Sequence, residues 1–155
     1  METPIITMKS ILLVEDDPRD AELTLTALEE HNLANKVAVV HDGEQALDFL
    51  YCRGKFTGRP GGNPILVLLD LKMPKVGGLE VLKEIKSNDQ LKVIPVVILT
   101  SSRETPDLIE CYKYGVNAYV VKPVNFGEFV KAVKQLGIFW AAVNEPPPIP
   151  ASDPA

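Results

Sequence analysis

Residues 65–70, with the sequence ILVLLD, decide the fold of this chain. Five consecutive apolar residues without polar alternation predict a strand that is buried on both faces, as in a parallel sheet. The run ends at one acid, Asp70. Similar apolar runs occur at Ile11–Val14, Val37–Val40, Val96–Leu99 and Ala118–Val121. We therefore expect five buried strands.

Segments with apolar residues at helical spacing separate these runs. Pro18 opens the first of them, at a position where a first helical turn tolerates proline. The spaced residues are Ala21, Leu25 and Leu28; Ala46, Leu47 and Leu50; Leu79, Leu82 and Ile85; and Phe126, Phe129, Val130, Val133 and Leu136. This alternation predicts an α/β fold with parallel strands and helices on both faces. Five units are too few for a closed barrel, so we expect a flavodoxin-like (βα)5 doubly wound sheet, whose class has the strand order 2-1-3-4-5.

Length and composition fit one domain. The chain has 155 residues, 46% hydrophobic residues and a formal net charge of −5, and we expect a single domain over residues 1–143. No apolar run reaches the roughly 18–20 residues of a membrane helix. The excess of acidic over basic residues argues against nucleic-acid binding. The absence of a signal-peptide pattern predicts a cytoplasmic protein. Arg53–Asn63, rich in glycine and basic residues, is expected to be a mobile loop, and the proline-rich residues 144–155 a disordered tail.

Polar side chains follow four of the expected strands. Glu15, Asp16 and Asp17 follow the first, Asp70 ends the third, Thr100, Ser101 and Ser102 follow the fourth, and Lys122 follows the fifth. The carboxyl ends of parallel strands meet at one edge of the sheet, and ligands bind where the strand order reverses, here between the first and third strands. We therefore expect the acidic cluster to face Asp70 across that crevice.

Carboxylates at this density repel one another, so either one of them holds a proton or a cation is bound. A set of oxygen ligands suits a hard ion such as Mg²⁺, which commonly pairs with phosphate oxygens. Lys122 would add a positive charge and Thr100 a hydroxyl donor, a combination suited to a phosphoryl group in transfer. Asp70, alone at its strand end, is the best placed nucleophile.

Each feature also has a purely structural interpretation. The acids at 15–17 could be helix caps or first-turn charges, Asp70 could be a turn residue, and residues 100–102 could cap a helix. A single lysine such as Lys122 is usually solvated. The set is more specific than its members, because all four features end strands on one predicted edge.

These residues resemble the receiver domain of two-component response regulators, over Lys9–Trp140. The matching motifs are LVEDD (13–17), LLDLKMP (68–74) with Gly77-Gly78, ILTS (98–101) and YVVKP (119–123). The resemblance implies that Asp70 accepts a phosphoryl group from a sensor histidine kinase. It also implies that Asp16, Asp70 and the backbone carbonyl of Lys72 bind Mg²⁺, while Glu15 acts through a metal-bound water.

The resemblance further implies a switch. Lys122 would contact the phosphoryl group, and its bond to Pro123 would be cis. Thr100 would move its hydroxyl toward the phosphoryl group, and Tyr119 would change rotamer in response. Phosphate would thereby stabilise an active arrangement, and partner affinity would follow. The protein would be a signalling receiver that catalyses only its own phosphorylation and dephosphorylation, rather than an enzyme.

Within the family, the chain is most similar to the stand-alone regulators that partner bacterial phytochromes. The loop 53–63, the ILTSS run (98–102) and the ending GIFW (137–140) before NEPPP (144–148) indicate this. Two residues depart from the common pattern. Glu15 stands where many relatives carry Asp, and Lys72 beside the acceptor would slow the access of water or phosphodonor. Asp17 is expected to start a helix rather than to bind the metal.

After the last expected helix no effector domain follows, so output is expected through a surface presented to another protein. The apolar side chains of Tyr114, Tyr119, Phe139 and Trp140 could form a symmetric contact, and we expect a homodimer. Alternatively, Phe139 and Trp140 cover the edge of the sheet.

Three other functions stay open on the residues alone. A Mg²⁺-dependent phosphatase with an aspartyl nucleophile would need a second Asp where Lys72 stands. A flavin carrier of the same architecture would need a phosphate cradle after the first strand, where Glu15, Asp16 and Asp17 would repel phosphate. A receiver-like interaction module without phosphorylation would not need the intact acidic set.

Overall fold

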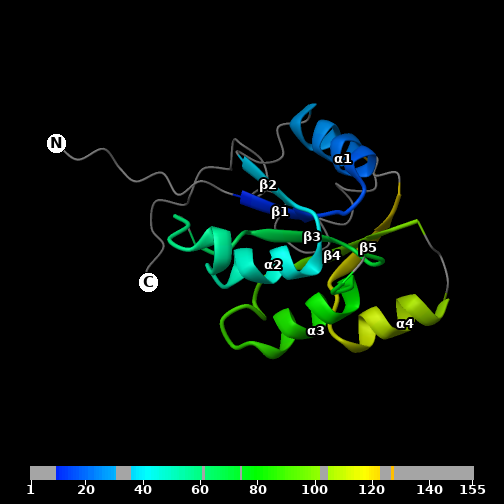
Figure 1. The fold of residues 1–155 in the computed structure, drawn as a ribbon. Coiled ribbons are helices and arrows are strands. Elements are labelled where there is room, and N and C mark those ends of the chain that lie inside the picture. The colour runs from blue at the N-terminus through cyan, green and yellow to red at the C-terminus, as the bar shows by residue number, and fades with distance from the viewer. Residues whose placement is uncertain are drawn as a thin grey trace, which may run out of the picture.

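Five parallel strands form one sheet in the order β2-β1-β3-β4-β5 (Figure 1). The computed structural model describes residues 10–30, 36–60, 62–73, 75–101, 105–122 and 127. The strands are β1 (Ser10–Val14), β2 (Lys36–Val40), β3 (Leu66–Asp70), β4 (Val96–Thr100) and β5 (Ala118–Val121). The predicted flavodoxin-like fold is therefore confirmed, and each strand begins and ends within one residue of its expected run.

The described helices cover both faces of the sheet. They are α1 (Pro18–Glu30), α2 (Gly43–Leu50), α3 (Gly78–Ser87) and α4 (Thr105–Lys113), with a short 3-10 helix η1 (Gly54–Phe56). Figure 1 shows α1 on one side of the sheet and the other three on the opposite side. None of the described helices is long and apolar enough to cross a membrane. The expected last helix, apart from residue 127, and the tail 144–155 lie outside the described residues.

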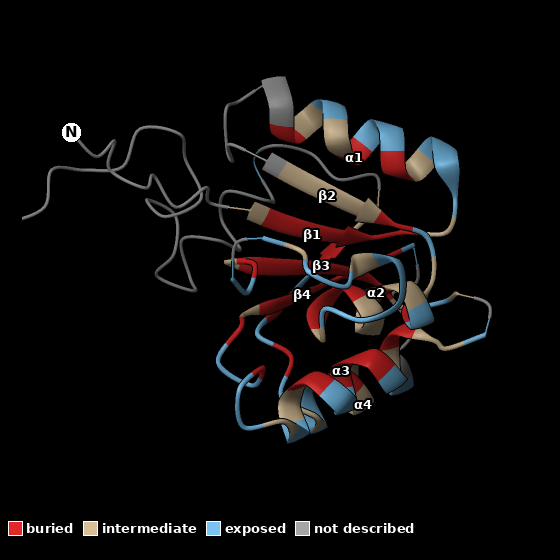
Figure 2. Cartoon of the chain, turned by 60° about the vertical axis from the view of Figure 1, so that its left-hand side comes forward, coloured by how far each residue is buried: buried red, intermediate tan, exposed pale blue. Residues whose placement is uncertain are grey.

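The strands supply alternate side chains to two cores, one packed against α1 and the other against α2, α3 and α4. All five residues of β3 and of β4 are buried, as are four of the five in β1, and Figure 2 shows these strands as the buried centre of the domain. Each buried leucine or isoleucine contributes roughly 1.5–3 kcal/mol. The ends of these strands are therefore held firmly in place.

The buried face of α1 differs slightly from the expected one. The helix begins at Pro18, as predicted. Ala21 and Leu28 are buried, but the third buried position between them is Thr24, whereas Leu25 is only half-buried. A search for apolar spacing misses Thr24 because threonine carries a hydroxyl.

The loop after α2 is more structured than its composition indicates. The guanidinium of Arg59 lies 4.0 Å from the centroid of the Phe49 ring and donates a hydrogen bond to the Phe49 carbonyl oxygen (3.0 Å). Phe56, in η1, meets Phe49 edge-on with ring centroids 5.1 Å apart. The expected mobile loop Arg53–Asn63 is thus anchored to α2 through residues 56 and 59, because basic and aromatic side chains find partners that a glycine-rich composition does not reveal.

Two glycines allow the segment after β3 to pack closely against neighbouring helices. A Cβ atom on Gly78 would overlap the carbonyl oxygen of Asp70, and a Cβ atom on Gly43 would overlap that of Val76. The Gly78 N–H also donates to the Leu71 carbonyl oxygen (3.0 Å). Glycine at position 78 therefore lets α3 begin directly beside the end of β3.

We predict that Gly78→Ala destabilises the protein by about 1–3 kcal/mol, because the backbone at Asp70 must move to accept the methyl group. Urea unfolding measures this. Gly62→Ala is the matched control, since a Cβ there meets no atom within 4 Å, and its effect should stay within about 0.5 kcal/mol. Equal unfolding midpoints for the two variants would contradict the prediction.

Candidate functional site

An acidic cluster lies where β1 and β3 end. Val14 is paired with Leu69, so the residues that follow them, Glu15 and Asp70, lie side by side. Carboxylate oxygens of Glu15, Asp16 and Asp70 all lie within 4.8 Å of one another. Glu15 and Asp70 are buried and Asp16 is half-buried. The prediction that these acids face Asp70 across the sheet edge is confirmed.

Asp17 stays out of this cluster. Its Oδ1 accepts hydrogen bonds from the backbone N–H groups of Arg19 (2.8 Å) and Asp20 (3.3 Å), so it caps α1 as predicted. Its own N–H donates to Glu15 Oε2 (3.2 Å). The start of α1 therefore helps to orient the buried Glu15 carboxylate.

The Lys122 ammonium lies among the carboxylates. Its Nζ is 2.5 Å from Glu15 Oε1, 3.0 Å from Asp20 Oδ2 and 3.4 Å from Asp70 Oδ1. The backbone N–H of Lys122 donates to the Thr100 carbonyl oxygen (2.8 Å). This hydrogen bond fixes the backbone of Lys122 beside the end of β4. Burial disfavours the ammonium, but the surrounding carboxylates outweigh burial and raise the pKa of Lys122 above its ordinary value. Lys122 therefore stays charged.

Asp20 is a member of this group that the sequence prediction missed. It lies in the first turn of α1, directly before the buried Ala21. Its position beside the buried face of α1 is the one sequence feature that points toward the site. The same residue is, however, equally well explained as a favourable charge at a helix N-terminus, so its contact with Lys122 could not be foreseen.

The Asp70 carboxyl group holds its proton unusually tightly. The pKa of Asp70 is raised from 3.8 to about 7, mainly by burial, and the hydrogen bond to Glu15 and the charge of Glu15 act in the same direction. The Lys122 ammonium lowers the pKa but does not restore its ordinary value. The excess negative charge expected from the sequence is therefore present at this site.

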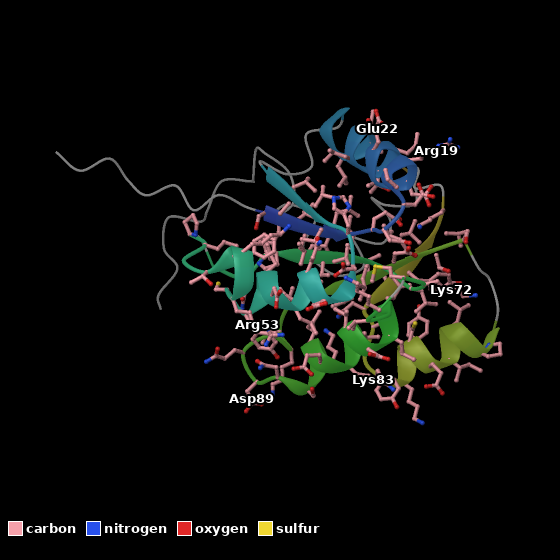
Figure 3. The ribbon with its side chains drawn as sticks, viewed as in Figure 1. Arg19, Glu22, Arg53, Lys72, Lys83 and Asp89 are labelled. Atoms are coloured by element: carbon pink, nitrogen blue, oxygen red, sulfur yellow. The ribbon has the colours of Figure 1, made fainter. Side chains whose placement is uncertain are left out.

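The cluster fits a small divalent cation. Its three carboxylates offer the hard oxygen ligands that such ions prefer, and a bound cation would relieve their mutual repulsion. Lys72, whose backbone carbonyl is the fourth expected contributor, follows β3 and has an exposed side chain (Figure 3). The contribution of that carbonyl stays a prediction.

Thr100 and Tyr119 lie on the same face of the sheet. Tyr119 is paired with Ile98, and Thr100 follows Ile98 by two residues, so their side chains share a side. Thr100 is buried, whereas Tyr119 is 36% exposed and meets Tyr112 of α4 edge-on, with ring centroids 6.2 Å apart. The two expected switch residues thus lie on one face of two adjacent strands, and their movement stays a prediction. Pro123, and with it the expected cis bond, lies outside the described residues.

Comparison with known proteins identifies the family. Residues 11–134 match the family described as the response regulator receiver domain. The chain belongs to this family. Response regulators receive a phosphoryl group from sensor histidine kinases, and the acidic cluster of this receiver lies at the sheet edge that its motifs predict.

Several relatives of this receiver are described as phytochrome regulators. The solved structure of the bacteriophytochrome response regulator AtBRR is 61% identical, with a TM-score of 0.82, and the match covers 89% of this chain and 99% of that one. The phosphorylated cyanobacterial phytochrome response regulator RcpA is 38% identical, with a TM-score of 0.72 and coverage of 87% and 95%.

The response regulator Rcp1 of Synechocystis sp. is also similar. It is 41% identical over 132 residues, which are 85% of this chain and 88% of Rcp1. A crystal structure of its Mn²⁺-bound form matches with a TM-score of 0.71 and 39% identity, covering 90% of this chain and 99% of that one.

The raised pKa of Asp70 predicts how the stability of the metal-free receiver depends on pH. The folded protein binds this proton more tightly than the unfolded chain does, so its contribution to stability is complete below about pH 4 and is lost as the pH rises through about 7. Relative to Asp70→Asn, the wild type should therefore lose on the order of 2–4 kcal/mol between pH 4 and pH 8.

Urea unfolding in EDTA at several pH values measures this difference. Asp89→Asn serves as the control, because the Asp89 side chain is 94% exposed and its removal should not change the pH profile. A constant difference between wild type and Asp70→Asn across this range would contradict the prediction.

Proposed function

We propose that this receiver is the phosphoacceptor of a two-component phosphorelay and that Asp70 accepts the phosphoryl group. The observation that carries the proposal is the convergence of three carboxylates, from Glu15, Asp16 and Asp70, with the Lys122 ammonium at one sheet edge. Nucleophile, negative ligand set and fixed positive charge are the parts that phosphoryl transfer requires.

Asp70 acts as the nucleophile. One of its carboxylate oxygens attacks the phosphorus of a phosphohistidine, so that a P–O bond forms while the P–N bond breaks and the leaving imidazole takes up a proton. The product is an acyl phosphate on Asp70, and its hydrolysis by water returns the carboxylate and releases inorganic phosphate. Attack requires ionised Asp70, which burial opposes in the metal-free cluster.

We assign Mg²⁺ as the cofactor, held by Asp16, Asp70 and the Lys72 carbonyl, with Glu15 acting through a water. When bound, this ion supplies positive charge against the ionised cluster and the phosphoryl oxygens. Support for a divalent ion comes from the oxygen-only cluster and from the Mn²⁺-bound form of Rcp1. Lys122 stabilises the phosphoryl oxygens with a charge that its carboxylate partners keep in place.

Thr100 and Tyr119 are the proposed switch. The Thr100 hydroxyl donates to a phosphoryl oxygen, and Tyr119, on the same face of the sheet, changes rotamer and reshapes the surface formed with α4. The partial exposure of Tyr119 and its edge contact with Tyr112 support a role at the surface. The phosphoryl group shifts the population because it binds one arrangement of these side chains better than the other.

We propose a bacterial phytochrome as the sensor kinase. The supporting observation is the 61% identity to a regulator described as that of a bacteriophytochrome. The receiver is proposed to be a signalling protein rather than an enzyme, since Lys72 stands where an aspartyl phosphatase would need a second Asp. The homodimer also stays a prediction, because Phe139 and Trp140 lie outside the described residues.

Treatment with acetyl phosphate and Mg²⁺ should add one phosphoryl group to the protein, as read by intact-mass spectrometry. Asp70→Asn should gain none, because an amide nitrogen does not replace the nucleophilic oxygen, and EDTA should suppress the gain in the wild type. Asp89→Asn, which removes an exposed acid outside the site, should be labelled normally. Undiminished labelling of Asp70→Asn would exclude Asp70 as the acceptor.

Phosphotransfer kinetics test the proposed partner. A histidine-phosphorylated bacterial phytochrome should transfer its phosphoryl group to this receiver about tenfold or more faster than an unrelated sensor kinase, a difference of about 1.4 kcal/mol in the barrier. Equal rates from both kinases, with Asp70 still labelled by acetyl phosphate, would refute the phytochrome assignment while leaving the acceptor assignment intact.

A further inference from the structure

We propose that Asp20 is a positioning residue that holds Lys122 away from the acceptor and so opposes phosphorylation. The inference rests on the proposed function. Asp20 lies in the first turn of α1, whereas Lys122 follows β5, 102 positions later in the sequence. Asp20 does not belong to the three carboxylates that could share a metal ion, so its contact with Lys122 is a separate feature of the site.

The Lys122 ammonium lies closer to α1 and β1 than to the acceptor. Its Nζ donates a hydrogen bond to Asp20 Oδ2 (3.0 Å) and is paired with Glu15 Oε1 at 2.5 Å. The Asp70 Oδ1 atom is farther away, at 3.4 Å. A phosphoryl group on Asp70 must therefore compete with Asp20 and Glu15 for the same ammonium.

A cation among Glu15, Asp16 and Asp70 would change the balance of this competition. Its positive charge would weaken the attraction of Glu15 and Asp70 for the ammonium, because both belong to the candidate ligand set. Asp20 lies outside that set and would keep its full charge. In the metal-loaded receiver Asp20 therefore becomes the main competitor of the phosphoryl group for Lys122.

Asp20 is also exposed enough for its ion pair with Lys122 to break and form again. Its side chain is 38% exposed, against 0% for Glu15 and 8% for Asp70. A partly exposed ion pair is weaker than a buried one and is screened by salt, so phosphoryl oxygens can displace it. The negative charge of Asp20 also repels an anionic phosphoryl group directly. Competition for Lys122 and direct repulsion by Asp20 both disfavour the phosphoryl group, so loss of the Asp20 charge should favour the phosphorylated state.

Asp20→Asn tests the proposal, because it keeps the size of the side chain and removes its charge. With excess Mg²⁺, the affinity for beryllofluoride, a phosphoryl mimic, is measured by calorimetric titration and its dissociation by stopped flow. We expect about three- to tenfold tighter binding than in the wild type, as for the loss of one competing ion pair. The gain should appear as slower dissociation and should shrink at high salt, and Asp20→Glu should bind with wild-type affinity.

Glu22→Gln is the matched control. Glu22 is an exposed acid on the outer side of the same helix, as Figure 3 shows, and its neutralisation removes the same charge without touching Lys122. If Asp20→Asn and Glu22→Gln change the affinity equally, or if Asp20→Asn weakens binding, the proposal is overturned. If the wild type binds beryllofluoride no better than Asp70→Asn does, the proposed function fails and the role of Asp20 falls with it.

Discussion

One ammonium shared by buried carboxylates is the constraint on which this site depends. The side chains of Glu15, Asp70 and Lys122 are 0%, 8% and 12% exposed. Removing such charges from water costs several kcal/mol per ion, and pairing repays that cost only in part. Burial, together with the neighbouring Glu15 carboxylate, accordingly raises the pKa of Asp70 despite the ammonium. Such an arrangement contributes little to the stability of the fold, so its role is to bind a ligand.

The sheet keeps these charges together despite their repulsion. β3 and β4 are buried along their whole length and β1 along most of it, and the pairing of β1 with β3 sets Glu15 beside Asp70. The contact of Gly78 with the Asp70 carbonyl then brings α3 against the same strand end. Relaxing the electrostatic repulsion by moving the backbone would expose apolar surface, at roughly 25 cal/mol for each Å². Hydrophobic burial thus holds the unfavourable charges in place.

Much of this arrangement could be predicted from the sequence, for identifiable reasons. Strands buried on both faces appear as uninterrupted apolar runs, and parallel strands bring Asp70 and Lys122 to one edge whatever the details of packing. Contacts that depend on the direction of one side chain could not be predicted. Thr24 replaces an apolar residue on the buried face of α1, Arg59 covers an aromatic ring from a glycine-rich loop, and Asp20 reaches Lys122 across 102 positions. The sequence pattern is equally consistent with a solvent-exposed side chain at each of these three positions.

A shared ammonium also explains how such a site can act reversibly. A switch needs two states that differ by only a few kcal/mol, because a larger gap would leave one of them unpopulated. Leaving a carboxylate such as Glu15 or Asp70 buried without the ammonium would cost about 3–5 kcal/mol and would work against such a balance. Lys122 Nζ lies 3.0 Å from Asp20 Oδ2 and 3.4 Å from Asp70 Oδ1, so passing the ammonium from Asp20 toward oxygens bound at Asp70 exchanges one charged partner for another within the same site. The cost of the exchange is therefore small, because the ammonium keeps a negatively charged partner throughout.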